Sequence, residues 1–423
     1  MKAALKLSLL LSLLIGSAHV VLAQAPSQVI VANGGIGGDS NLVQMAAWNL
    51  GTGNYSVFDS IEAGSVQSVF IWGRDAYVCA DSMLIRYNLD TYQREASAVI
   101  KGVRRVAVWE DKVLVSKGVG AIGDHFEVRY AANLGPCFGV PTIGGNCNGV
   151  VVVGDTGYVA NPVSFVNTTG NLAVVDMRGA ALHRVMDMDT MGKFIDRLYV
   201  HEGKVVSTNI VKFNNPLWGW ISQYDIANGT FTHHKVNMPL SQGAGIDNGK
   251  LYANFGGNVG GFDLASGQLT DPVVVPGTWT AMVLDSVNNR FYLSRSDLET
   301  YGWLIEFDYN GTRLDSVETG VSPVALAVDY NMTVGNQPRN NANFIKAYPQ
   351  PFADELIVDL RHVKSPALQV TIHDLAGKLI YTTKVAGNEF LKIELPHLAA
   401  GAYILTLRTR AEALTLKVIK TPK

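Results

Sequence analysis

Hydrophobic and polar residues alternate along most of the chain in short runs, which are separated by polar turns that contain Gly, Asn or Asp. After residue 24, no segment keeps the helical period of about 3.6 residues over several turns. Alternation with a period of two is typical of β-strands with one buried face. The pattern therefore predicts an all-β protein.

A first recurring motif consists of two apolar strands around a tight polar turn. Complete copies occur at 69–79, 106–116, 150–160, 198–208, 245–255 and 282–294. A further copy is divided between 326–330 (LAVDY) and 29–33 (VIVAN). A repeat that is divided between the ends of a region is completed only when those ends meet, so this motif predicts a closed ring.

A second recurring motif is an apolar strand that ends in Asp or Asn and is followed by Gly or another turn residue. Copies occur at 48–55, 87–94, 175–182, 224–231, 262–269 and 307–314. Asp and Asn side chains form local turns and Gly adopts positive φ, so the motif predicts a hairpin between the third and fourth strands of each repeat. The third repeat, about residues 103–135, lacks it.

One copy of each motif per repeat predicts seven four-stranded blades, spaced about 40 residues apart. We therefore expect residues 24–330 to form a seven-bladed β-propeller in which 321–330 closes the ring beside 29–33. These motifs resemble those of the YVTN-like and quinoprotein-like propellers. The resemblance implies a fold and no particular function.

The composition changes after an Asn-rich segment, 331–343, which is predicted to be a linker. Short strands that are richer in Leu, Ile and Lys follow it and predict a small seven-stranded β-sandwich over residues 344–423. The candidate strands are 345–348, 356–360, 368–373, 378–385, 390–395, 402–409 and 414–419.

Four motifs follow one another in this tail: 348–351 (YPQP), 372–378 (IHDLAGK), 395–403 (LPHLAAGAY) and 417–420 (KVIK). Together they resemble the type A C-terminal sorting domain of the type IX secretion system of Bacteroidota. The resemblance implies export through the outer membrane, with the secretion machinery as partner. From the residues themselves, the last apolar strand is expected to leave a basic end exposed to a receptor. The matching sorting-motif residues are Tyr348, Pro349, Pro351, Asp374, Gly377, Gly401, Tyr403, Lys417 and Lys420.

Residues 1–23 have a basic start, an apolar run and small residues before Gln24, which predicts a signal peptide cleaved after Ala23. No apolar run is long enough for a membrane-spanning helix, so no transmembrane segment is expected. Together with the tail, the leader predicts a protein that is secreted or held at the outer-membrane surface. The formal net charge of −2 offers no basic field for nucleic acid.

The chain has three cysteines, Cys79, Cys137 and Cys147, and is predicted to enter an oxidising compartment. Cys137 and Cys147 flank a loop rich in Gly and Pro and are a candidate disulfide pair. Cys79 lies in an apolar strand and is expected to be a buried thiol.

In a propeller, the loops between second and third strands and those between blades share one face, and the longest of them hold the candidate ligand residues. Trp218 and Trp220 can offer flat rings to a sugar or an apolar ligand, and the alternative is that they pack between blades. Asp124 and His125, in another of these loops, are the best candidates for acid/base chemistry.

The sequence contains no G-x-S-x-G, H-E-x-x-H or P-loop motif, and no catalytic residue, metal site or cofactor is predicted. The adjacent His233 and His234 are expected on opposite faces of a strand, where they cannot share one metal ion. The preferred hypothesis is a non-enzymatic module that binds a glycan, a peptide or a surface partner. The alternatives are a lactonase or polysaccharide lyase, or a quinoprotein, with polar residues from several blades meeting at the ring axis.

Overall fold

The part of the chain that the computed structural model describes is almost entirely β-structure, with one 3-10 helix, η1 (Asp189–Gly192). The described residues are 27–34, 42–118, 120–121, 123–161, 169–210, 218–330, 346–349, 352–360, 368–374, 378–385, 390–408 and 413–421. The predicted signal peptide, 1–23, and the predicted linker, 331–343, lie outside them. No helix in the described part of the chain is long and apolar enough to cross a bilayer. The all-β prediction is confirmed.

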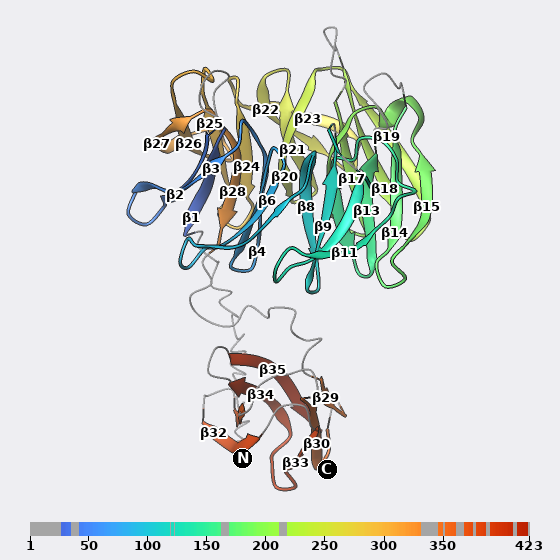
Figure 1. The fold of residues 1–423 in the computed structure, drawn as a ribbon, viewed down its shortest axis with the longest axis vertical. Helices are drawn as coiled ribbons and strands as arrows, with labels where there is room; N and C mark the ends of the chain where they lie inside the picture. The colour runs from blue at the N-terminus through green and yellow to red at the C-terminus, as the bar shows by residue number, and fades with distance from the viewer. Residues whose placement is uncertain are drawn as a thin grey trace, which may run out of the picture.

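Between residues 28 and 329, the described strands form seven four-stranded antiparallel sheets (Figure 1). The first strands are β4 (Val66–Trp72), β8 (Val103–Trp109), β12 (Val150–Val153), β16 (Ile195–His201), β20 (Leu240–Asp247), β24 (Ala281–Asp285) and β28 (Pro323–Asp329). The second strands are β5 (Asp75–Ala80), β9 (Lys112–Lys117), β13 (Thr156–Asn161), β17 (Lys204–Asn209), β21 (Lys250–Phe255), β25 (Arg290–Arg295) and β1 (Gln28–Asn33).

The outer half of each sheet has the same order. The third strands are β6 (Met83–Asn88), β10 (Phe126–Tyr130), β14 (Asn171–Asp176), β18 (Gly219–Asp225), β22 (Asn258–Asp263), β26 (Tyr301–Asp308) and β2 (Leu42–Asn49). The fourth strands are β7 (Arg94–Val99), β11 (Pro136–Gly139), β15 (Ala181–Asp187), β19 (Thr230–Val236), β23 (Gln268–Val275), β27 (Arg313–Val321) and β3 (Tyr55–Glu62).

The second strand of each sheet is the most buried one. In β5, β9, β13, β17 and β21, every residue after the first is buried. On β5, for example, Val78 packs toward β1 and β2, and Tyr77 packs toward β8 and β9. A strand that is covered on both faces has a nearly continuous run of apolar residues, whereas the exposed fourth strands contain polar residues between the apolar ones.

The first strands contact one another in the order β4, β8, β12, β16, β20, β24 and β28, and β28 contacts β4. Strand β28 also pairs antiparallel with β1, with Val328 opposite Val29 and Ala325 opposite Ala32 (Figure 1). Asp329, which is fully buried at the end of β28, accepts hydrogen bonds from Gln28 Nε2 at 2.8 Å and Arg74 Nη1 at 2.6 Å. These bonds join β28 to β1 and to the sheet of β4.

The second sequence motif forms the turns between third and fourth strands. Its Asp or Asn side chain accepts a hydrogen bond from a backbone N–H two or three residues later, at Asn49, Asn88, Asp176, Asp225, Asp263 and Asp308. These turns lie at the same end of the sheets as the turns between first and second strands. The other end, which we call the loop end, carries the longer connections and the candidate site.

The tail folds into two sheets that face each other. One contains β29 (Lys346–Tyr348), β30 (Glu355–Asp359) and β33 (Phe390–Glu394), and the other contains β32 (Leu379–Val385), β31 (Leu368–His373), β34 (Gly401–Arg408) and β35 (Ala413–Lys420). Leu356 and Val358 of the first sheet pack with Ile372, Leu405 and Val418 of the second in one apolar core. All seven predicted tail strands are present.

Candidate functional site

Three arginines and one aspartate lie at the loop end of two first strands. Arg104 and Arg105 are the second and third residues of β8, and Asp196 and Arg197 occupy the same positions in β16. The first strands surround the axis of the ring of sheets because each contacts the next. We call these four residues the axial arginine cluster.

Asp196 holds the cluster together. Arg105 Nη2 lies 3.0 Å from Asp196 Oδ1, and Asn148 Nδ2 donates to the same oxygen at 3.2 Å. Arg197 Nε lies 3.7 Å from Asp196 Oδ2. Strand β12 lies between β8 and β16, so the Arg105–Asp196 pair joins two sheets that are not neighbours.

The cluster has more positive than negative charge. The side chains of Arg105, Asp196 and Arg197 are 19%, 14% and 30% exposed, and within the described residues Arg104 makes no ion pair. The Nε–H groups of Arg105 and Arg197 and the hydroxyl of Tyr199 are buried without a hydrogen-bond partner in that part of the chain. Buried donors without an acceptor are costly, so an added acceptor would satisfy the two Nε–H groups.

Burial and the charge of Arg105 lower the pKa of both Arg104 and Arg197. Burial opposes the ionisation of Asp196, but the charges of Arg105 and Arg197 outweigh it and hold the pKa of Asp196 below its usual range. Arginine stays protonated near neutral pH even when its pKa is lowered, so all four groups are charged there. The resulting field favours a bound anion.

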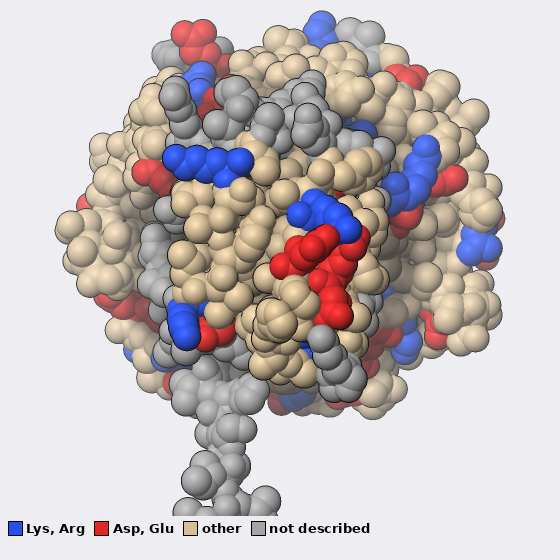
Figure 2. All heavy atoms as spheres, turned by 90° about the horizontal axis from the view of Figure 1, so that it is seen from below, with Lys and Arg blue, Asp and Glu red and all other residues tan. Residues whose placement is uncertain are grey.

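Several charged side chains elsewhere in the described chain form surface ion pairs. Figure 2 shows basic and acidic side chains close together on the face that is seen from below. On the smaller sheet of the tail, Lys392 Nζ lies 2.8 Å from a carboxylate oxygen of Glu355 and 3.2 Å from one of Glu394. The axial arginine cluster differs from such surface pairs because it is partly buried and unbalanced.

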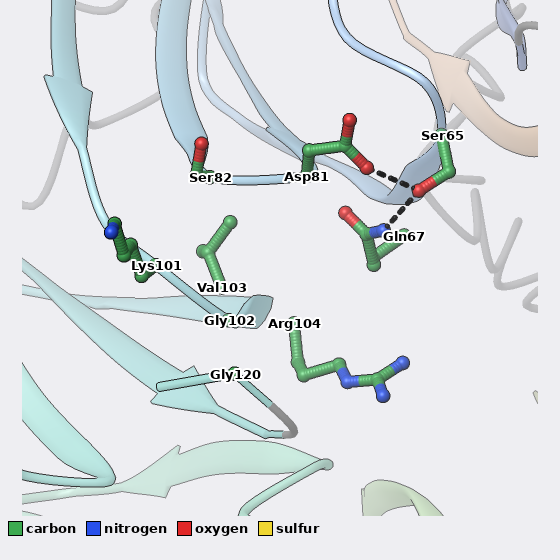
Figure 3. A pocket seen from close by; sticks show the side chains of 9 residues that line it. All are labelled: Ser65, Gln67, Asp81, Ser82, Lys101, Gly102, Val103, Arg104 and Gly120. Carbon is green, nitrogen blue, oxygen red and sulfur yellow. Dashed lines mark hydrogen bonds between the residues drawn. The ribbon is translucent and has the colours of Figure 1, made fainter. Parts of the chain in front are cut away.

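A pocket of ≈ 510 Å³ opens beside Arg104, between the sheet of β4 and that of β8 (Figure 3). Along one wall, Gln67 Nε2 donates to Ser65 Oγ at 2.8 Å, and Ser65 donates to Asp81 Oδ1 at 2.5 Å. Lys101 lies on the other side. Ligand pockets commonly enclose about 300 to 1,000 Å³, so a small anion or one sugar residue can reach Arg104 here.

Trp218 and Trp220 lie at the start of β18, a third strand, and not beside the axial arginine cluster. Trp218 is exposed, and Lys235 Nζ lies 4.8 Å from the centre of its ring. Trp220 is half-buried and lies opposite Lys235 and Asn209 in the sheet. Ligand binding by these rings stays a prediction.

Asp124 and His125 precede β10, in the sheet of β8, so the structure does not bring them together with the two tryptophans. The carboxylate of Asp124 packs against Gly139, where it leaves no room for a side chain. His125 Nδ1 lies 3.4 Å from the carbonyl oxygen of Lys117. Their use as an acid/base pair also stays a prediction.

The predicted disulfide between Cys137 and Cys147 is absent, because all three cysteines are free thiols. The expected loop contains a strand: Cys137 lies on β11 and is half-buried, whereas Cys147 is buried in the core beside it. Pairing of β11 with β10 holds Cys137 in a sheet. Burial raises the pKa of Cys147 and of the fully buried Cys79 to about 12.

Several sorting-motif residues shape the tail. The N–H of Lys378 donates to Asp374 Oδ1 at 2.9 Å, which links the residue after β31 to the residue before β32. Tyr403 is buried and its hydroxyl donates to the carbonyl of Ala399 at 2.8 Å. Tyr348 is exposed at the end of β29 and precedes Pro349, and Gly401 begins β34. Pro351, Gly377 and the side chain of Lys417 lie outside the described residues.

Lys420 does not have the exposed position expected of it. It is 2% exposed, its Nζ lies 2.9 Å from Asp354 Oδ1, and the same nitrogen lies 5.6 Å from the centre of the Phe352 ring. Alternate residues of a strand face opposite sides, and Lys420 faces inward while Ile419 is exposed. The prediction that Lys420 forms part of an exposed basic end is therefore wrong.

The family model of the secretion system C-terminal sorting domain matches residues 346–421. The tail is a type IX sorting domain. This confirms the resemblance drawn from the four tail motifs. A sorting domain of this kind indicates export by the type IX secretion system, and it places the protein at the cell surface or in the medium.

The remainder of the chain is similar to β-propeller-like structures. A quinoprotein alcohol dehydrogenase-like protein from Bacteroides thetaiotaomicron is 12% identical with a TM-score of 0.54, over 73% of this chain and 79% of that chain. The WD40 β-propeller domain of Doa1 is 12% identical with a TM-score of 0.45, over 64% and 86%. The first likeness shows the fold alone. No curated protein matches the chain.

Proposed function

We propose that residues 24–330 form a seven-bladed β-propeller whose last blade is completed by both ends of the ring. Three observations support it: the seven four-stranded sheets, the ring of contacts among the first strands, and the pairing of β28 with β1. Closure leaves no open sheet between the first and last repeats. Asp329 stabilises the joint through Gln28 and Arg74.

The propeller is a non-enzymatic binding module that works outside a cell of the Bacteroidota, after Sec export through the predicted leader, 1–23, and type IX export through the tail. Its ligand carries an anionic group that the axial arginine cluster binds. One observation carries this proposal: the cluster holds three arginines and one carboxylate, which contacts only Arg105 and Arg197, and the buried Nε–H groups of these two arginines have no acceptor in the described chain. An anion would supply the missing acceptors.

The alternative is a propeller enzyme with its site at the ring axis. The axis does carry polar groups from several sheets, among them Asp196 and Asn148. A general acid or base works best with a pKa near the working pH, whereas the arginines lower the pKa of Asp196 further from neutrality. The charge pattern therefore favours binding over acid/base catalysis.

The test is calorimetric titration of the purified full-length protein with citrate at low ionic strength, because salt screens such contacts. The variants are Arg104→Gln at the axis and Arg178→Gln, an exposed arginine on a turn at the opposite end of its sheet. We expect Arg178→Gln to bind citrate like the wild type and Arg104→Gln to bind it about tenfold more weakly. Equal affinities in all three proteins, or no binding of citrate to any of them, would contradict the proposal.

A further inference from the structure

Two third strands begin with the same pattern, an aromatic residue, a glycine and a tryptophan: 218–220 (WGW) and 301–303 (YGW). In both, the glycine faces the first strand of the next sheet. A side chain at Gly219 would clash with Leu240, the first residue of β20, and one at Gly302 would clash with Pro323, the first residue of β28. Because side chains alternate along a strand, the two aromatic rings of each pattern face the opposite way.

The rings of the second pattern are open to solvent. Tyr301 is 68% exposed and Trp303 is 45% exposed, although Ile305, two residues further along the same face of β26, is buried. They line a pocket of ≈ 600 Å³, together with Arg295, Ser296, Asp297, Thr300, Ile305 and Arg313. Two large exposed aromatic side chains beside a pocket are typical of a binding surface.

The charge at this pocket is positive. The carboxylate of Asp297 is bound within its own loop, where it accepts hydrogen bonds from the backbone N–H groups of Glu299 and Thr300 and from the Thr300 hydroxyl. Arg295 lies opposite Trp303 in the sheet and is exposed, and Arg313 is exposed on β27. In the described chain neither arginine forms an ion pair. Arg313 Nη2 donates to Ser316 Oγ, and the remaining N–H groups of the two guanidinium groups are available to an anion.

We propose that Tyr301, Trp303, Arg295 and Arg313, which we call the rim platform, bind an acidic sugar residue of a polysaccharide. The aromatic rings pack against the apolar C–H face of the sugar, and the guanidinium groups bind its carboxylate. A peptide would not need two neighbouring flat rings with charged groups at their edge, whereas a uronic acid presents both a flat apolar face and a carboxylate. The two rings lie on β26, Arg295 lies on β25 and Arg313 on β27, so the platform belongs to a different sheet from either strand of the axial arginine cluster.

The test uses hexagalacturonate as the probe and calorimetry on the full-length protein. The variant Tyr301→Ala/Trp303→Ala removes both rings, and Trp72→Ala is the matched control, since Trp72 has the same 45% exposure as Trp303 at the other end of a sheet. We expect the affinity to fall about tenfold or more in the double variant and to stay unchanged in Trp72→Ala. An unchanged affinity in the double variant would overturn the proposal.

A second variant, Arg295→Gln/Arg313→Gln, keeps the rings and removes the charge, and its melting temperature is measured in parallel. It should bind hexagalacturonate several-fold more weakly, and the wild type should bind neutral maltohexaose much more weakly than hexagalacturonate. Equal affinity for hexagalacturonate and maltohexaose would contradict the proposal that the platform prefers acidic sugars. All titrations are repeated in the Arg104→Gln background. If removing the Tyr301 and Trp303 rings no longer weakens hexagalacturonate binding there, the rim-platform proposal is overturned. If Arg104→Gln binds citrate like the wild type, only the proposal for the axial arginine cluster is overturned.

Discussion

Arg105 on β8 and Asp196 on β16 form an ion pair with Nη2 and Oδ1 3.0 Å apart, although 91 residues and one whole sheet separate them. The pair uses the carboxylate of the axial arginine cluster and leaves Arg104 without an ion-pair partner in the described chain. Positive charge is therefore concentrated where the first strands of several sheets meet. Such an arrangement lowers the stability of the free protein, and a bound anion would restore that stability.

Arg104→Gln tests this cost. Burial and the charge of Arg105 disfavour the charged form of Arg104, so its neutral replacement should stabilise the free protein by about 0.5 to 2 kcal/mol, the usual gain at a strained functional site. Chemical denaturation measures the change, with Arg178→Gln as the control. A clear loss of stability in Arg104→Gln would show that an acceptor already balances the charge.

Asp196→Asn tests how much the negative charge of the cluster stabilises the protein. It removes the carboxylate that Arg105, Arg197 and Asn148 contact, and it leaves their charges unopposed. We expect a loss of about 1 to 3 kcal/mol, less than for a fully buried pair because the arginines are partly exposed. Adding citrate should raise the melting temperature of this variant more than that of the wild type. An equal rise would argue against anion binding at the cluster.

Lys420 is expected to stabilise the fold of the sorting domain. We do not expect the secretion machinery to contact its charge directly. Lys420→Ala removes the contacts with Asp354 and Phe352, whereas Lys420→Met keeps the packing over the Phe352 ring. We expect export to fall in Lys420→Ala and to be largely kept in Lys420→Met, measured by cell fractionation beside a truncation of 344–423 and the exposed-lysine control Lys392→Ala. Loss of export in a folded Lys420→Met protein would mean that the machinery reads the charge.

His233 and His234 predict a loss of stability in mild acid. Burial first, and then the charge of His234, lowers the pKa of His233, and burial and Lys204 lower that of His234, from the ordinary 6.5. The unfolded chain therefore takes up protons at a higher pH than the folded one, so stability falls as the pH drops below about 6.5. His233→Gln should flatten this slope between pH 7 and 5, and exposed His183→Gln should not. Denaturation midpoints of the three proteins across this pH range measure the slope, and an unchanged slope in His233→Gln would contradict the prediction.

Much of the fold could be predicted from the sequence because its determinants are local. Turn residues such as Asn49 and Asp225 mark each hairpin by themselves, and the buried second strands are recognisable as apolar runs. Long-range placement was harder to predict. Lys420 was placed on the correct strand but on the wrong face, because a shift of one residue in a strand exchanges the faces.

The axial arginine cluster was missed because its members come together only when the sheets form a ring. A signal was present in the sequence: Arg104-Arg105 and Asp196-Arg197 both follow the first apolar residue of a first strand, where the sheet of β4 has Gln67 and Ser68. The rim platform repeats at 301–303 the aromatic, glycine, tryptophan pattern of 218–220, but the exposure of such rings depends on how neighbouring strands pack, which the sequence does not show.

Anion binding at the axial arginine cluster can be tested directly by locating a bound anion in crystals of the protein soaked with selenate. Anomalous scattering from selenium locates the anion without reference to its ligands. If the axial arginine cluster binds anions, a selenium peak will lie within hydrogen-bond distance of Arg104 or Arg197 beside the Arg105–Asp196 pair. Peaks confined to exposed arginines such as Arg178, with none at the axis, would contradict it.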